Sequence, residues 1–357
     1  MEETTGKGNE PVQEIKNEID EAERLTAGMA VPKGSLGVLE RQVKKLIRAW
    51  GRPRWEWKPC HYVFAADNGI TAEGVVHYPQ DITYLQACNM VKGISTINCF
   101  CQVNDVPCTV VDVGINREES AGINCKVRRG TRDFLVEPAM TPEEFQAAFD
   151  AGAARVREAQ ERGCTILSFG EMGIGNTTTS SAVLHALTGA PLEKIVGYGA
   201  NPEHPEVIGR KREVIAQAMK MYEGEMKTPQ AIIQHVGGFD IAALCGAMVA
   251  CAECHMPFVL DGFITSVAFA CAARINKNVP AMAIASHLSK EPGMTYALAV
   301  GGITPDDVPI HAALALGEGT GAILELMILK TMLYTVQHVE QMANLEAEAE
   351  KSGSSPS

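Results

Sequence analysis

Five short apolar runs constrain the fold of this 357-residue chain more than any other feature of its sequence. Each run ends in small or acidic residues; the runs are 61–66, 108–114, 164–170, 257–262 and 281–286. Helical patterns, such as 141–162 and 241–253, lie between several of them. Strands that alternate with helices pair in parallel and are covered on both faces. The pattern therefore predicts the α/β class, with a parallel Rossmann-like sheet and helices on both faces.

The residues at the ends of these runs predict where a ligand binds. They are Asp67, Gly114, Gly170, Asp261 and Ser286. In open parallel sheets, ligands bind beyond the carboxyl ends of the strands. We therefore expect these residues to lie along one edge of the sheet.

The two chain ends differ from this central region. Residues 12–27 and 38–50 show helical spacing, and a strongly apolar helix is predicted from Gly321 to about Val336. Residues 1–12 have no periodicity, and 346–357 pass from an acidic run into a Ser- and Gly-rich end. Both terminal segments are predicted to be disordered tails.

Composition and charge exclude several classes of protein. Hydrophobic residues make up 46% of the chain, which is typical of globular proteins. The 31 basic and 43 acidic residues give a net charge of −12, which disfavours nucleic acid or an anionic membrane as a partner. No apolar run is long enough to span a membrane, and the polar, acidic start does not resemble a secretory signal. We expect a cytoplasmic location.

The eleven cysteines agree with a reducing compartment. Their number is odd and they are scattered through apolar segments, so we expect buried thiols rather than a disulfide framework. The segment from Cys251 to His255 has the C-x-x-C-H spacing of covalent haem attachment, but it ends a helical pattern rich in small residues. No second Cys or His pair completes a zinc site. We expect neither haem nor metal here.

A glycine-rich segment over 170–179 follows a predicted strand and opens a helix. Backbone N–H groups at such a point favour an anion. The spacing is nearly that of a Walker A motif, but Asn176 occupies the place of the lysine, which argues against a nucleoside-triphosphatase. A monophosphate site and a turn needed only for close packing both remain open. Glu171 is unusual beside a phosphate, because its carboxylate would be repelled.

Two further segments contain candidate site residues. Glu318 lies between Gly317 and Gly319, where a carboxylate can approach a ligand with little hindrance or can simply favour the start of the next helix. His77 and Tyr78 precede a proline and a helix that carries Gln86. They can line a pocket for a flat ring or lie in a solvated loop.

Seven motifs together resemble the nicotinate-nucleotide–dimethylbenzimidazole phosphoribosyltransferase family of cobamide biosynthesis. The match begins at 33–40 and ends near Leu333. In order, the motifs cover 66–70, 112–115, 170–178, 237–240, 260–263, 286–289 and 316–321. The resemblance implies transfer of phosphoribose from nicotinate mononucleotide to an aromatic lower base, with release of nicotinate and without cofactor or metal. It also implies a dimer and a small helical domain, here 13–50 with 322–345, beside a catalytic domain over 51–321.

The resemblance also implies roles for individual residues. Glu318 corresponds to the catalytic base. The chemistry of the transfer, rather than the resemblance, suggests Glu171 as a second carboxylate that stabilises the oxocarbenium-like centre. Phosphate and ribose contacts are assigned to Gly173, Gly175, Asn176, Thr177, Lys211, Asp261, Ser289, Gly317 and Gly319. Contacts with the lower base are assigned to Tyr78, Gln86, His77 and Leu316.

Two departures from the family pattern bear on the acceptor. Asn68 stands where histidine is expected, and His77 with Tyr78 stands where the family usually has smaller residues. These bulkier side chains suggest a phenolic acceptor, such as phenol or p-cresol, as well as or instead of dimethylbenzimidazole. Some members of the family that use such acceptors are pairs of related chains. A homodimer, a heterodimer with a related chain, and a catalytically silent partner subunit are therefore all open.

Overall fold

The computed structural model describes residues 22–199 and 203–352, which form two compact units. The first unit contains the described residues up to Trp57 and from Met327 onward, and the second is Lys58–Leu326. The predicted catalytic domain over 51–321 has slightly different bounds at both ends. Within the described residues, no helix combines the length and apolar character that a bilayer-spanning segment needs.

The first unit joins the two ends of the chain. It contains a helical segment over 22–27, α2 (Gly37–Ala49), the second part of α14 (Thr320–His338) and α15 (Met342–Lys351). Met29 and Gln341 form an antiparallel bridge, and the Ala30 N–H donates to the Glu340 carbonyl at 2.8 Å. The tail predicted from residue 346 is wrong up to Lys351, because its alanines and glutamates favour helix. The predicted tail over 1–12 lies outside the described residues, as do 353–357.

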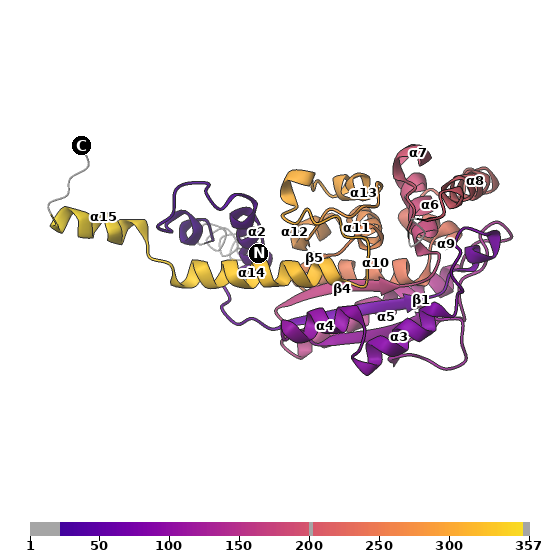
Figure 1. Cartoon of the computed structure of the whole chain (residues 1–357), viewed down its shortest axis with the longest axis horizontal. Helices are drawn as coiled ribbons and strands as arrows, with labels where there is room; N and C mark the ends of the chain where they lie inside the picture. Colours follow the sequence, from indigo (N-terminus) through magenta and orange to yellow (C-terminus); the bar gives the residue numbers. More distant parts are fainter. Residues whose placement is uncertain (1–21, 200–202, 353–357) are drawn as a thin grey trace, which may run out of the picture. The chain divides into compact units, whose positions relative to one another are not determined.

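The second unit is built on a sheet of six parallel strands (Figure 1). These are β1 (Pro59–Ala66), β2 (Cys108–Gly114), β3 (Ile123–Asn124), β4 (Ile166–Met172), β5 (Phe258–Leu260) and β6 (Ala283–Ala285), in the spatial order β3-β2-β1-β4-β5-β6. All eight residues of β1 are buried, as expected for a strand covered on both faces. The predicted fold class is confirmed. Of these strands only β3 was missed, because two residues carry no apolar pattern.

Helices cover both faces of this sheet. They are α3 (Ile82–Lys92), α4 (Thr96–Val103), α5 (Pro142–Glu161), α6 (Asn176–Thr188), α7 (Leu192–Ile195), α8 (Glu206–Met221), α9 (Pro229–Val236), α10 (Phe239–Glu253), α11 (Phe263–Ile275), α12 (Val279–Met282) and α13 (Met294–Val300), with short 3-10 turns at Gly69–Glu73 and Pro305–Asp307. Figure 1 shows α3 and α4 on one side of the sheet and α11 to α13 on the other. Helix α10 contacts β1, β2 and β4 and also packs against α5 and α11. Cys251 is buried within α10, and His255 follows the end of that helix.

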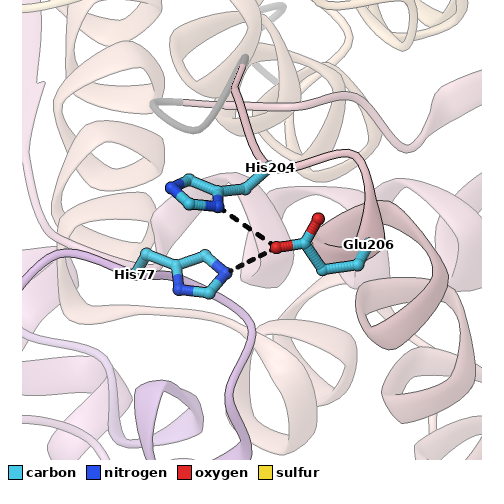
Figure 2. A group of neighbouring side chains, drawn as sticks. All are labelled: His77, His204 and Glu206. Carbon is cyan, nitrogen blue, oxygen red and sulfur yellow. Dashed lines mark hydrogen bonds and ion pairs between the residues drawn. The ribbon is translucent and has the colours of Figure 1, made fainter.

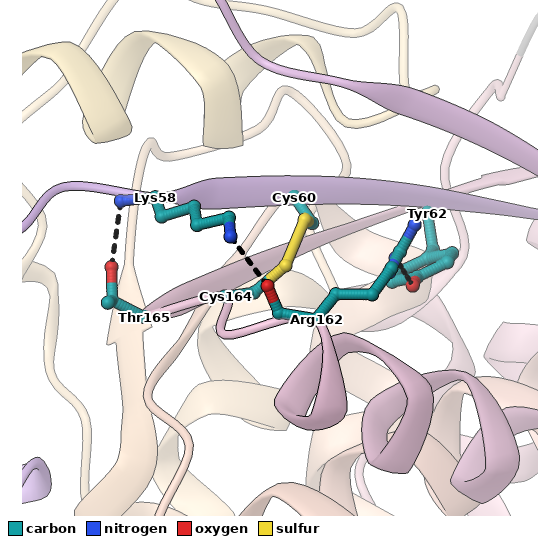
Figure 3. The surroundings of a disulfide bond; sticks show 6 residues. All are labelled: Lys58, Cys60, Tyr62, Arg162, Cys164 and Thr165. Carbon is teal, nitrogen blue, oxygen red and sulfur yellow. Dashed lines mark hydrogen bonds between the residues drawn. A yellow bond between two sulfur atoms is a disulfide. The ribbon is translucent and has the colours of Figure 1, made fainter.

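The structure pairs Cys60 with Cys164, so the expectation of thiols is wrong for these two residues (Figure 3). They are 104 residues apart, yet their Cα atoms are 6.4 Å apart, because β1 and the start of β4 are neighbours in the sheet. The Lys58 backbone N–H donates to Thr165 Oγ1 at 2.9 Å beside them. The other nine cysteines are free. The cysteine argument for a reducing compartment is therefore weaker than the sequence suggested.

The strand order determines where a ligand can enter. The chain crosses to one side of β1 for β2 and β3, and to the other side for β4, β5 and β6. A crevice therefore opens between the carboxyl ends of β1 and β4, which is the usual ligand position in such sheets.

Candidate functional site

A cavity of about 330 Å³ lies beyond the carboxyl ends of the strands. Its size is within the usual range for small-molecule sites. It is lined by Tyr78, Ile82, Gln86, Glu171, Met172, Gly173, Ile174, Asn176, Thr177, Gly199, Gly262, Phe263, Ile264, His287, Ser289, Glu291, Ala315, Leu316, Gly317 and Glu318. The segments at the carboxyl ends of β4, β5 and β6 therefore converge on one site.

Glu318 lies at the wall of this cavity and is almost fully buried. Its Oε1 accepts a hydrogen bond of 2.7 Å from Gln86 Nε2 on α3. Its Oε2 is buried without a hydrogen-bonding partner among the described residues. The Ile97 N–H nevertheless lies near enough to stabilise the ionised form of the Glu318 carboxyl group. Burial raises the pKa of Glu318 above its usual value. A carboxyl group with a raised pKa and one unpaired oxygen can accept a proton from a ligand.

The backbone that carries Glu318 is held in an uncommon conformation. Glu318 has a φ of 63°, in the left-handed region that side chains seldom adopt. The buried His61, in the middle of β1, contacts the Glu318 carbonyl through Nε2 at 2.9 Å and Ser168 Oγ through Nδ1 at 2.8 Å. Burial lowers the pKa of His61 to about 4, so its ring is neutral. His61 was missed, although a single polar residue within an apolar strand is a recognisable signal.

Asp261 supports the same turn from the other side. Its carboxylate accepts hydrogen bonds from the N–H groups of Gly319, Gly321 and Ala322, at 3.1, 2.8 and 3.2 Å. These N–H groups belong to the start of α14, where a negative charge is favourable. Neither Asp261 nor Gly319 lines the cavity. The predicted ribose contacts of both residues therefore have no support in the cavity lining.

A second group of carboxylates surrounds Asn176. Its side-chain amide donates to Glu171, at the end of β4, and to Asp240 Oδ2 at 3.2 Å. Burial, reinforced by the neighbouring Asp240, raises the pKa of Glu171 to about 8, and burial raises that of Asp240 to about 6. Asn176 lines the cavity, but its amide holds these two acidic groups, so its predicted role in binding phosphate stays a prediction.

We expect Glu171 to make stability depend on pH. Its pKa is raised in the folded state from an ordinary value of 4.5, so the folded protein binds the proton that the unfolded chain has released. The stabilisation is complete below pH 4.5 and is lost as the pH rises through about 8. The free energy of unfolding of the wild type, measured in urea, should therefore fall as the pH rises over this range. The contribution of Glu171 to this fall is at most about 1.4 kcal/mol per pH unit. Glu171→Gln should flatten the slope; an unchanged slope would contradict the assignment.

The predicted phosphate residues are only partly brought together. Gly173, Thr177 and Ser289 line the cavity, whereas Gly175 precedes α6 with a φ of 93° and does not. The N–H of Ile174 donates to Thr83, and that of Asn176 donates to the Gly173 carbonyl, so fewer backbone donors are free than the motif suggested.

Lys211 supplies a positive charge near this end of the cavity. It lies on α8, is buried, and its Nζ donates to Thr177 Oγ1 at 2.9 Å and to the Gly197 carbonyl at 3.2 Å. Burial lowers the pKa of Lys211 to about 8. Lys211 does not line the cavity itself, but it contacts a residue that does.

The predicted lower-base residues separate into two groups. Tyr78, Gln86 and Leu316 line the cavity, as does Gly317, the residue after Leu316. His77 does not line it; its ring stacks on that of His204, with the ring centres 4.0 Å apart. The expectation that His77 narrows the acceptor pocket is therefore not supported.

Two polar lining residues were missed. The Nδ1 atom of His287 lies 3.0 Å from Ser286 Oγ, within hydrogen-bonding distance, and Glu291 Oε1 accepts from the Gly199 N–H at 2.8 Å. Both belong to the segment after β6, where Ser286 was expected at the strand end and only Ser289 was assigned a substrate contact. The polar residues that follow a predicted strand end were the available signal.

Comparisons with known proteins agree with this geometry. A family model described as a phosphoribosyltransferase matches residues 12–348. The nicotinate-nucleotide–dimethylbenzimidazole phosphoribosyltransferase of Cupriavidus necator is 37% identical over 298 residues, which cover 82% of this chain and 84% of that protein. A protein of the same name from Clostridium perfringens is 36% identical over 327 residues, covering 91% of this chain and 88% of that one. The crystal structure of CobT from Thermus thermophilus matches with a TM-score of 0.84 and 32% identity, over 96% of this chain and 100% of that chain.

Proposed function

Because the chain belongs to the nicotinate-nucleotide–dimethylbenzimidazole phosphoribosyltransferase family, we propose that it moves phosphoribose from nicotinate mononucleotide to the aromatic lower base of a cobamide. Nicotinate is the second product. The observation that carries the proposal is Glu318, a buried carboxyl group at the wall of a cavity beyond the sheet, whose Oε2 has no hydrogen-bonding partner within 22–199 and 203–352.

The proposed reaction needs one proton acceptor. The bond from the ribose carbon to the pyridinium nitrogen breaks, and its electron pair leaves with nicotinate as a neutral ring. A ring nitrogen of dimethylbenzimidazole forms the new bond with its lone pair. The proton on the other nitrogen goes to Glu318, which suits a base whose pKa burial has raised. Gln86 keeps the carboxyl group oriented through its 2.7 Å hydrogen bond.

Glu171 has a supporting electrostatic role in this proposal. The substrate carries a pyridinium cation, and positive charge develops on the ribose in the transition state. A nearby cation favours the charged carboxylate, so substrate binding lowers the pKa of Glu171 from its value of about 8. The resulting negative charge then stabilises the oxocarbenium-like centre.

The phosphate is proposed to lie at the Lys211 end of the cavity, where Thr177 and Ser289 offer hydroxyl groups. We expect Lys211→Gln to weaken nicotinate mononucleotide binding by about 10–100-fold, the cost of losing a hydrogen bond to a charged group. Isothermal titration measures the change. Lys220→Gln, an exposed position on the same helix, is the matched control. Equal affinity in the two variants would place the phosphate elsewhere.

Dimethylbenzimidazole is the proposed acceptor, because the relatives from Cupriavidus necator and Clostridium perfringens are named for it. The case for a phenolic acceptor depended on two bulky side chains, and of these only Tyr78 lines the cavity. A competition assay with equal concentrations of dimethylbenzimidazole and p-cresol tests the acceptor. Mainly benzimidazole nucleotide is expected, whereas mainly phenolic product would reverse the assignment.

The activity itself is tested with the purified chain alone. Nicotinate mononucleotide and dimethylbenzimidazole should give equimolar nicotinate and ribosylated base. No turnover by the single chain, but turnover after a related chain is added, would instead support the silent-subunit alternative.

Assembly and location follow from the same proposal. Four apolar side chains in α3, α4 and the turn between them are more than half exposed (Leu85, Val91, Ile94 and Val103), which favours a dimer, either of two identical chains or with a related chain. Light scattering measures the mass of the assembly.

The proposed substrate also bears on the location of the protein. It is a charged phosphate ester that does not cross membranes unaided, which favours the cytoplasm.

A further inference from the structure

Two histidines and a glutamate converge outside the cavity (Figure 2). His77 belongs to the loop before α3, His204 precedes α8, and Glu206 is the first residue of α8. His77 Nε2 is 3.2 Å from Glu206 Oε1, and His204 Nδ1 is 3.1 Å from the same oxygen. Figure 2 shows both imidazole rings directed at this carboxylate. We propose that these three side chains bind a zinc-type divalent cation, an inference that goes beyond the transfer reaction.

The donor set fits such an ion. Neutral imidazole nitrogens and a carboxylate oxygen are typical zinc ligands, with bonds of about 2.0–2.2 Å. In tetrahedral geometry, ligand atoms are then roughly 3.3–3.6 Å apart. The two measured separations from Glu206 are 3.1 and 3.2 Å, and all three ligand atoms lie within 4.8 Å of one another. Small side-chain movements suffice to place a cation between them.

The three ligands leave a coordination position open to solvent. Each of the three side chains is roughly half exposed, with His77 at 47%, His204 at 46% and Glu206 at 63%. Three protein ligands plus water is a common zinc arrangement. Only one of the three is acidic, so the cluster is not simply a group of surface carboxylates. The net charge of −12 also favours cations near the protein.

A cation bound by the cluster would join the loop that carries Tyr78 to helix α8. Tyr78, next to His77, lines the cavity, and α8 carries Lys211, which contacts the cavity residue Thr177. Arg210 of α8 already binds the segment before His77, because its Nε donates to the Glu73 carbonyl at 2.7 Å. His77 already contacts Glu206 of α8, and a bound ion replaces that contact by coordinate bonds to both residues. The ion therefore restrains the loop that carries Tyr78.

Zinc titration of the wild type tests the binding. Zn²⁺ is added to the metal-free protein, and binding is measured by competition with a chromophoric chelator. We expect one ion per chain that is lost in the triple variant His77→Gln, His204→Gln, Glu206→Gln. The single variant His204→Gln should bind at least roughly 100-fold more weakly, since even outer-sphere partners of a metal can contribute that much.

The triple variant also corrects for zinc bound by thiols, such as the exposed Cys99. His338→Gln, an exposed histidine of α14, is the matched control and should bind zinc as the wild type does. Equal zinc binding by the wild type and the triple variant would overturn the site.

Hydrogen exchange tests the restraint of the loop. Zn²⁺ should slow amide exchange in residues 74–81 of the wild type and of His338→Gln, but not in the triple variant. Unchanged exchange in a zinc-loaded wild type would refute the link between the loop and α8. Neither measurement uses turnover, so failure of the proposed transferase activity is distinguishable from failure of this site.

Discussion

Glu318→Gln is expected to lower turnover by about 10²–10⁴-fold, or roughly 3–5 kcal/mol of activation free energy, with little loss of substrate binding. The substitution preserves the shape of the side chain and the oxygen that accepts from Gln86. It replaces the unpaired Oε2 by an amide that cannot take a proton. Steady-state kinetics at several concentrations of both substrates separates kcat from KM.

Glu325→Gln is the matched control for this variant. Glu325 lies on α14, is fully buried, and does not line the cavity. Burial raises its pKa to about 9, so an amide resembles its neutral form at ordinary pH and turnover should be kept.

The pH dependence of the wild type tests the same role. Turnover should fall in acid as Glu318 becomes protonated. Wild-type turnover in Glu318→Gln would exclude it as the base.

Gly170→Ala is expected to reduce turnover by about 100-fold, because it displaces the turn that carries Glu318. A Cβ atom at this position would lie 2.0 Å from the Glu318 carbonyl oxygen and 2.7 Å from the Gly319 nitrogen. Both are backbone atoms, so the turn must move or the strand must bend. Overpacking of this kind also costs about 1–3 kcal/mol of unfolding free energy. Kinetics and urea unfolding measure the two effects.

Gly209→Ala provides the comparison for the second variant. Gly209 is an exposed residue within α8, and apart from its neighbours and the nearby backbone of its own helix no described atom lies within 4 Å of the position that a Cβ would take. Alanine should therefore leave turnover unchanged and stabilise the helix by up to about 1 kcal/mol. If Gly170→Ala also left turnover unchanged, the close contact between β4 and the turn that carries Glu318 would not contribute to catalysis.

The sequence by itself determined the class of fold and the segments of the site. Long apolar strands and periodic helices are local signals, since a strand buried on both faces must be apolar along its length. Residues 61–66 and 108–114 lie within β1 and β2 for this reason, and the pattern at 141–162 corresponds to α5. The glycine-flanked Glu318 and the strand-end Glu171 were likewise recognisable from their positions.

Only the tertiary structure decided which side chains face the cavity and which support them. Asp261 was predicted as a ribose contact, but its carboxylate binds three N–H groups at the start of α14. Asn176 holds two carboxylates together, and His77 turns toward His204. The Cys60–Cys164 bond likewise depends on the pairing of β1 with β4. Apart from the contact of Asn176 with Glu171, these contacts join residues that are far apart in the chain, so no local pattern encodes them. They arise only when the strands are ordered in the sheet.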